Sequence, residues 1–454
     1  MSDRAFDPAV VSKLTDEEDA RFVAERPRSR ALLERARGAM PNGVPMSWFA
    51  SSYAHGPLFV ARGEGARFTD VDGNEYSDFN IADMSMFCGY APEPVVRAVA
   101  ERMAAGSQFL LPTEDSVWVA EELAARFGLP KWQFTLSASQ ANVEAIRVAR
   151  VRTGRDVVLM FEGKYHGHFD QGLVELRDGR PVPEEPGLPN DVTRHTRVIP
   201  FNDPGALEEA LRPRDVALVM AEPVMTNNHG LVLPEPGFHA SLRSITSETG
   251  TLLCLDETHT QVCGPGGLTR IWGLEPDLLS SGKSVAGGVP FGTYGMTDEV
   301  ASVLEQDDRR AGTNHGTVAT GGTLFGNALS MAAARATLSE VLTNEAYRHA
   351  AELGGRLADG LKAALAGAGL EWFVHRLYAR SGTVFAPTPP RDAREAEASE
   401  DTQLTNLFRV WLANRGVWEA IPGAGPTVPV PATGEDVDRY VRAYGSLVRE
   451  LTRA

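Results

Sequence analysis

Short, uninterrupted apolar segments alternate with helix-like segments through the middle of this chain, and this pattern constrains its fold more than any other feature. Strands that are apolar along their whole length are typical of a parallel sheet that helices cover on both faces. The sequence predicts such strands at residues 157–161, 216–221, 252–255 and 278–280. It predicts the surrounding helices at residues 94–105, 115–127, 140–153, 205–211 and 237–248.

The two ends of the chain have a different pattern. Before the alternation lie a predicted amphipathic helix at 29–39 and a β meander at 59–71, which ends in the turn Asp72-Gly73-Asn74. After it the sequence is mostly helical through residue 366, with a strand near 383–385 and helices near 403–414 and 435–452. We therefore expect residues 76–335 to form a large domain, and residues 1–75 and 336–454 to contribute to a smaller α+β domain built from both termini.

Two proline-rich or acidic stretches, residues 180–189 and 387–401, are expected to be surface loops. Such loops either connect elements or gate a site.

Charge and composition exclude several classes of partner. The 454 residues include 44 Lys and Arg against 60 Asp and Glu, for a net charge of −16, with no basic cluster. Such a chain repels nucleic acid and anionic membrane surfaces. The longest apolar runs are far shorter than the roughly 20 residues that span a bilayer. The chain has three cysteines and begins without a signal-peptide pattern, so we expect a cytoplasmic protein.

Several familiar motifs are incomplete. Gly282-Lys283-Ser284 resembles the end of a phosphate-binding P-loop, but Asp277 stands where that loop needs glycine. The chain has no G-x-G-x-x-G dinucleotide fingerprint. Two groups of possible ligands match no established metal spacing, so no metal is expected: His166, His168 and Asp170, and Cys254, Asp256, His259 and Cys263.

Two residues at strand ends point to chemistry. Asp256 ends an apolar strand, where ligands of α/β sheets bind, although a helix-capping role explains it equally well. Lys283 follows the next strand among small residues, which is unusual because most lysines are solvated. Buried lysines serve as nucleophiles toward carbonyl groups. A third feature is the small-residue helix start at Ser137 to Ser139, which suits a phosphate or serves as a plain N-cap.

These features occur in an order that resembles a known family. Six short motifs of the chain are similar to the motifs of class III aminotransferases. They are Ser137-Ala138-Ser139-Gln140-Ala141, Tyr165-His166-Gly167, Glu222-Pro223-Val224, Asp256-Glu257-Thr258, Ser281-Gly282-Lys283 and Gly322-Thr323-Leu324-Phe325-Gly326-Asn327. The nearest branch is that of the glutamate-1-semialdehyde aminomutases. The resemblance implies the fold of type I pyridoxal-phosphate-dependent transferases and, with it, pyridoxal 5′-phosphate (PLP) as cofactor.

The resemblance also implies a role for each matching residue. Lys283 would bind the cofactor aldehyde and later carry the substrate proton, Asp256 would hold the pyridine nitrogen protonated, and Tyr165 would stack on the ring. Thr323 would reach the phosphate bound by a second subunit, which makes a homodimer the expected unit. The rest of the implied cofactor site is Ser137, Ala138, Ser139, His166, Glu222 and Thr258.

The most important departure from the family is near the N-terminus. The aminomutases carry an arginine for the substrate carboxylate at or near the position of Phe49, and a phenyl ring cannot replace that interaction. The segment either packs internally or forms an apolar pocket wall for a bulky, aromatic or β-amino substrate. That predicted wall comprises Trp48, Phe49, Met84 and Phe87, with Met46 and Met86; Arg376 and Arg380 could hold a carboxylate elsewhere.

Three functions follow from these residues. The first is a ping-pong aminotransferase that moves an amino group from an amine or amino acid to a keto acid or aldehyde. The second is a 2,1-aminomutase, which the missing arginine disfavours for glutamate semialdehyde. The third is a PLP-binding protein with reduced activity. Ala138, Gln140 and Thr258 suggest it, because they stand where the family usually has Gly, Glu and Val, but the intact Lys283 and Asp256 disfavour it.

Overall fold

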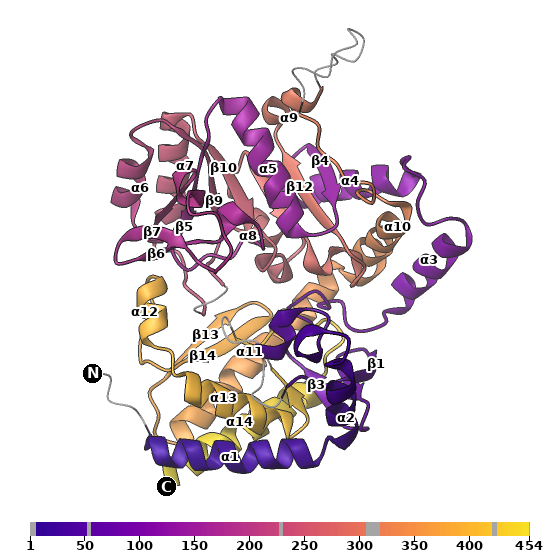
Figure 1. Ribbon diagram of the computed structural model, residues 1–454, viewed down its shortest axis with the longest axis vertical. Coiled ribbons are helices and arrows are strands. Elements are labelled where there is room, and N and C mark those ends of the chain that lie inside the picture. Colours follow the sequence, from indigo (N-terminus) through magenta and orange to yellow (C-terminus); the bar gives the residue numbers. More distant parts are fainter. Residues whose placement is uncertain (1–5, 52–55, 227–229, 306–317, 420–424, 454) are drawn as a thin grey trace. The chain divides into compact units, whose positions relative to one another are not determined.

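A computed structural model of the chain describes residues 6–51, 56–226, 230–305, 318–419 and 425–453 (Figure 1). The chain divides into two compact units. The central unit comprises Glu93–Tyr347 and Pro390–Ala398, and the terminal unit comprises Met1–Pro92, Arg348–Pro389 and Ser399–Ala454. Each unit is described by itself below.

The central unit is built on a seven-stranded sheet with the order β4-β12-β11-β10-β9-β5-β8. The strands β11, β10, β9, β5 and β8 each pair in parallel with the next one in this order. β12 pairs antiparallel with both β11 and β4. The mostly parallel sheet confirms the predicted fold class. The strands are β4 (Lys131–Thr135), β5 (Val157–Phe161), β8 (Thr196–Ile199), β9 (Val216–Ala221), β10 (Leu252–Asp256), β11 (Leu278–Ser281) and β12 (Gly292–Met296).

The apolar strands are buried on both faces, as their sequences require. In β9 every residue is buried: Val219 and Ala221 pack with side chains of α6 (Pro204–Leu211) and α7 (Phe238–Thr249). Leu218 and Met220, which point to the other face, pack with α5 (Ala138–Thr153). Full burial of a large apolar side chain contributes about 1.5–3 kcal/mol, so this strand anchors both layers of helices.

The expectation that residues 180–189 and 387–401 form loops is wrong in part. The stretches expected to be loops contain a strand, β7 (Arg180–Pro183), and a short helix, α12 (Ala393–Ala398). β7 pairs antiparallel with β6 (Val174–Arg177), and Ala393 and Ala396 pack into the core beside α6 and α7. The remaining helices are α3 (Glu93–Ala104), α4 (Glu114–Phe127), α8 (Gly267–Ile271), α9 (Asp298–Glu305) and α10 (Ala328–Ala336), which continues as a π-helical turn (Thr337–Val341).

The terminal unit combines both ends of the chain. Its four-stranded sheet has the order β1-β2-β3-β15, in which β15 pairs in parallel with β3 from the other end of the sequence. Its strands are β1 (Val60–Glu64), β2 (Arg67–Asp70), β3 (Glu75–Asp78), β15 (Val417–Trp418) and the hairpin β13 (Phe373–Leu377) and β14 (Arg380–Val384). Its helices are α1 (Pro8–Ala24), α2 (Pro27–Ala36), α13 (Thr402–Ala413) and α14 (Gly434–Arg453), with most of α11 (Asn344–Gly367).

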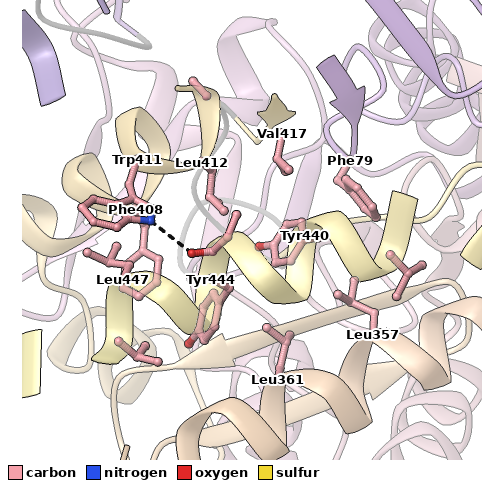
Figure 2. Close-up of a cluster of buried hydrophobic side chains, with 14 of the residues drawn as sticks. Phe79, Leu357, Leu361, Phe408, Trp411, Leu412, Val417, Tyr440, Tyr444 and Leu447 are labelled. Carbon is pink, nitrogen blue, oxygen red and sulfur yellow. Dashed lines mark hydrogen bonds between the residues drawn. The ribbon is translucent and has the colours of Figure 1, made fainter. Parts of the chain in front are cut away.

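Figure 2 shows the aromatic core of the terminal unit, where Phe79 after β3 and Leu357 on α11 lie with residues of α13 and α14. Trp411 Nε1 donates a hydrogen bond to Ala443 O (3.1 Å), so the one polar atom of its ring is satisfied. The unit boundaries at residues 92/93 and 347/348 differ from those predicted at 75/76 and 335/336. Residues 76–79 belong with the terminal sheet, and α10 and its π-helical turn pack with α3 in the central unit.

None of the helices among the described residues has both the length and the hydropathy of a membrane span.

Candidate active site

The carboxyl ends of β5, β9, β10 and β11 lie along one edge of the central sheet, because these strands are parallel. The residues predicted for the cofactor follow directly: Tyr165 and His166 after β5, Glu222 after β9, Asp256 at the end of β10, and Lys283 after β11.

Lys283 begins a short helical turn, Lys283–Ala286, directly after Gly282. Its backbone φ is +48°, in the left-handed region that non-glycine residues seldom adopt. Such a conformation costs of order 1–3 kcal/mol and persists where the surroundings hold it, most often at functional sites. The side chain is half-buried.

Asp256 is buried, and three groups of the chain hold its carboxylate in place. Oδ2 accepts from Asn142 Nδ2 (2.9 Å) and lies 2.9 Å from His166 Nδ1, while Oδ1 accepts from the Thr258 backbone N–H (3.0 Å). Burial alone would raise the pKa of Asp256, but the hydrogen bond and charge of His166, with Thr258 and Asn142, outweigh it and lower that pKa. The carboxylate is therefore anionic at neutral pH and suited to holding a cationic ring nitrogen.

Asn142 was not identified from the sequence. It lies on α5, is completely buried, and its Nδ2 also donates to His166 O (2.6 Å). It thus ties the helix to both the acid and the histidine. A polar residue within the apolar face of a helix is the signal that could have revealed it.

The N-terminus of α5 is built around Ser137, the N-cap, whose Oγ accepts from Gln140 N (3.3 Å). Gln140 Oε1 in turn accepts from the N–H of Leu136 (3.1 Å), the residue before the N-cap, so Gln140 helps to hold the chain at the start of the helix. First-turn N–H groups such as those of Ala138 and Ser139 have no acceptor inside a helix, and the helix dipole adds positive potential there. This end of α5 is suited to an anion.

Three glycines let backbone segments approach this helix start closely. A Cβ on Gly167 would lie 2.1 Å from Ser139 Oγ, one on Gly282 would lie 3.1 Å from Ala138 N, and one on Gly292 would lie 2.2 Å from the Ser137 carbonyl carbon. The loops after β5 and β11 therefore pack directly against Ser137, Ala138 and Ser139. This close packing joins the predicted phosphate site to Lys283.

Glu222 belongs to a second buried polar group. Its Oε2 accepts from Thr226 N (3.2 Å) and Oγ1 (2.8 Å), and Thr226 Oγ1 lies 2.9 Å from His259 Nδ1. Burial, and to a smaller extent the charge of Asp256, raises the pKa of Glu222 to about 7, against the opposing influence of His166 and Thr226. Glu222 Oε1 and His166 Nε2 are buried without a hydrogen-bond partner among the described residues, so polar capacity remains for a ligand.

Two predicted residues lie more at the surface. Tyr165 is 38% exposed, next to the buried Lys164, whose Nζ pairs with Glu184 Oε2 (3.1 Å). Thr323 is exposed, and its carbonyl oxygen accepts from Gln108 Nε2, which joins it to the start of the exposed segment Phe109-Leu110-Leu111 rather than to the network around Asp256.

The predicted substrate wall belongs to the terminal unit. Trp48 and Phe49 are exposed by 46% and 42%, with ring centroids 6.4 Å apart, whereas Met84 and Phe87 are buried. Met84 ends a run of four left-handed residues that begins at Ile81. Of the two arginines predicted for a carboxylate, Arg380 is buried in β14, and Arg376 is exposed in β13.

Among the described residues, no group of three His, Cys, Asp or Glu side chains is arranged as metal ligands.

Comparison with known proteins decides the family. The model of the class III aminotransferases matches residues 48–387. This chain belongs to the class III aminotransferases. It is 36% identical to a glutamate-1-semialdehyde 2,1-aminomutase of Sorangium cellulosum over 92% of this chain and 95% of the relative. The predicted family and its aminomutase-like branch are confirmed.

Solved structures agree with this assignment. A glutamate-1-semialdehyde aminomutase from Pseudomonas aeruginosa PAO1 is 39% identical, with a TM-score of 0.92 over 99% of this chain and all of that one. A β-phenylalanine aminotransferase from Variovorax paradoxus is 29% identical, with a TM-score of 0.86 over 96% of this chain and 97% of that one. A variant of the Pseudomonas enzyme with one lysine replaced by alanine was solved in complex with PMP.

The cofactor of this class III aminotransferase is PLP, and the residues present fit it. The start of α5 offers N–H donors to a phosphate, the anionic Asp256 offers a partner to a pyridinium, and Lys283 offers an amine to an aldehyde. The unpartnered Glu222 Oε1 provides further polar capacity within the same strand-end region.

Proposed function

We propose that this enzyme is a PLP-dependent aminotransferase that works by a ping-pong mechanism. The observation that carries the proposal is the placement of Asp256 and Lys283 at adjacent strand ends, beside a capped helix start. PLP, when bound, supplies an electron sink for the pair of electrons released at substrate Cα. The chain's own residues must bind it, orient it and move one proton.

Each side chain has a defined task in this proposal. Asp256 stays anionic and holds a proton on the pyridine nitrogen, and Asn142, His166 and the Thr258 amide keep its carboxylate in place. Lys283 would bind the cofactor aldehyde, would be released when the amino donor takes its place, and would then move the proton from substrate Cα to the former aldehyde carbon of the cofactor. Ser137, Ala138 and Ser139 would hold the phosphate, Tyr165 would cover the ring, and Glu222 and His166 would supply polar contacts to it.

A homodimer is the proposed working unit. Phe109, Leu110 and Leu111 are exposed by 48%, 73% and 70%, and Leu324 is 51% exposed. Gln108 joins these segments by its hydrogen bond to Thr323 O. Contiguous exposed apolar residues of this size indicate a protein interface. We propose that a second copy covers them and that Thr323 thereby reaches the phosphate in that copy.

The proposed donors are bulky, aromatic or β-amino compounds, and the acceptors are keto acids or aldehydes. Phe49 at or near the position of the aminomutases' arginine removes bidentate recognition of a carboxylate. The similarity to a β-phenylalanine aminotransferase supports a β-amino donor.

A second candidate is a glutamate-1-semialdehyde 2,1-aminomutase. The names of the relatives at 36% and 39% identity favour it. The two candidates differ in their need for an acceptor, because an aminomutase converts one substrate without a second.

Turnover assays with and without a keto acid separate these candidates. The aminotransferase requires both substrates and gives parallel double-reciprocal lines, whereas the aminomutase converts glutamate 1-semialdehyde alone. Turnover of glutamate 1-semialdehyde without an acceptor would replace the first proposal by the second. A holoenzyme that converts none of the donors in a broad panel would leave a PLP-binding protein of reduced activity.

A further inference from the structure

Gln261 joins the loop of the acid to the loop of the lysine. It lies on the short helical turn Thr260–Cys263 that follows Asp256, and it is 3% exposed. Its Nε2 donates to Thr258 O (3.0 Å) and to Gly282 O (2.9 Å). One amide group therefore uses both of its hydrogens to bridge two carbonyls, one from each loop.

This bridge acts where the sheet no longer holds the two strands together. The pairing of β10 with β11 ends at Asp256 and Ser280, and the Glu257 N–H to Ser280 O bond (2.9 Å) is the last backbone link at this edge among the described residues. Beyond that bond, the Gln261 side chain connects the two segments at Gly282. It does so at the peptide bond that leads directly into Lys283.

The backbone at this point needs to be held. Gly282 has φ −171° and ψ −130°, and Lys283 follows with φ +48°. The direction in which the Lys283 side chain leaves the backbone is set by these angles. A donor on the Gly282 carbonyl fixes the orientation of the peptide plane between them and thus opposes relaxation of Lys283 to an ordinary conformation.

We propose that Gln261 is a positioning residue that keeps the Lys283 amine in register with the Asp256 carboxylate. The inference rests on the proposed function, in which these two groups must engage two separate atoms of one rigid cofactor. A displacement of about 1 Å at a reacting group costs on the order of 100-fold in rate. Gln261 therefore acts on the rate of the lysine's chemistry and leaves substrate and phosphate binding nearly unchanged.

The test is Gln261→Leu, which keeps the size of the side chain and removes both donors. We expect kcat to fall about 10- to 100-fold with KM and the Kd for PLP within about threefold of wild type. We also expect borohydride to reduce the bond between the bound cofactor and Lys283 more slowly than in wild type. The rate is measured as the fraction of the Lys283 peptide that carries reduced cofactor over time, by mass spectrometry. In the apoprotein, hydrogen exchange over residues 279–287 should become faster.

Thr246→Val is the matched control. Thr246 is also fully buried in the central unit, and among the described residues its Oγ1 bonds only within α7, to Leu242 O (2.8 Å) and Arg243 O (3.0 Å). It should lower the melting temperature without changing kcat, the borohydride rate or exchange over 279–287. If Gln261→Leu does not fold, Gln261→Glu replaces the donor by an acceptor at the same length and should give the same three changes.

Two results would overturn the inference: a Gln261 variant that matches wild type in all three readouts, or one whose loss lies entirely in KM and the Kd for PLP. Wild-type protein that neither absorbs as a lysine-bound cofactor nor exchanges amino groups would instead refute the proposed function. The two failures are therefore distinguishable.

Discussion

Replacement of Gly167 by alanine tests whether the start of α5 is the phosphate site. Gly167 has φ +113°, and an added Cβ would lie 2.1 Å from Ser139 Oγ and 2.7 Å from Ser139 Cα. The hydroxyl could rotate away, but the Cα could not. Since carbon atoms in contact lie about 3.5 Å apart, the first turn of α5 would have to shift by about 0.8 Å.

A shift of this size disrupts hydrogen bonds that depend on the first-turn N–H groups. A hydrogen bond to a charged group contributes about 1.5–3 kcal/mol, and 1.4 kcal/mol corresponds to tenfold in affinity. We therefore expect Gly167→Ala to weaken PLP binding about 10- to 100-fold. The measurement is a titration of apoprotein with PLP, followed by absorbance.

Gly154→Ala provides the control at the opposite end of the same helix. Gly154 also has a positive φ, +66°, but nothing lies within 4 Å of an added Cβ. Gly154→Ala should lose about 1–2 kcal/mol of stability because alanine is strained at positive φ, and Gly167→Ala should lose more because of the added overlap with Ser139. Only Gly167→Ala should lose affinity for PLP. Equal affinities in the two variants would refute the assignment of the phosphate to this helix start.

Four further predictions follow from the site. Lys283→Ala should abolish the visible absorption of lysine-bound cofactor and turnover while keeping the melting temperature of the apoprotein, and residual turnover would contradict the role of Lys283. Asp256→Asn should still bind PLP but lose most of its kcat, because the ring nitrogen would no longer be held protonated; an unchanged kcat would exclude that role. The pKa of Glu222 is about 7 in the folded protein and near 4.5 in the unfolded chain, so between these pH values the folded apoprotein keeps a proton that the unfolded chain loses. As the pH rises through that range, the free energy of unfolding of wild type should fall by about 3 kcal/mol more than that of Glu222→Gln. Urea unfolding measures this difference, and parallel pH profiles would show that the pKa is not raised. Leu110→Glu should shift the protein from dimer to monomer in sedimentation, and a retained dimer would place the interface elsewhere.

The parallel strands could be predicted because burial on both faces leaves a plain sequence signal. β5 and β9 have the predicted bounds, and β10 and β11 each extend one residue further. β12 was missed because its sequence, Gly-Thr-Tyr-Gly-Met, lacks that signal. Its two glycines are explained by neighbours distant in sequence, since a Cβ on Gly292 would meet Ser137 and one on Gly295 would meet Trp132.

Of two further elements that were not predicted, one carries a sequence signal and the other depends on tertiary contacts. β4 has the sequence Lys-Trp-Gln-Phe-Thr, in which polar and apolar residues alternate, and it could have been recognised from that period. α12 lies in a stretch that is polar and rich in charge, and what fixes it is the packing of Ala393 and Ala396 into the central core.

Candidate cofactor residues could be named from the family motifs, but the residues that support them in the structure could not. Asn142 contacts Asp256, which lies 114 residues further along the chain. Gln261 contacts Gly282, 21 residues away, whereas Thr226 contacts Glu222, only 4 residues away. The two long-range pairs meet only once the sheet has formed. Thr226 could have been linked to Glu222, yet its further contact with His259 again requires β9 and β10 to lie side by side.

The most direct test of the central claim is the absorption spectrum of purified protein from about 300 to 500 nm, before and after single amines and amino acids are added without an acceptor. The account predicts a band of lysine-bound PLP that moves to the pyridoxamine form with particular donors, with one oxo product released per site. A protein with no such band even after PLP is added would contradict the account.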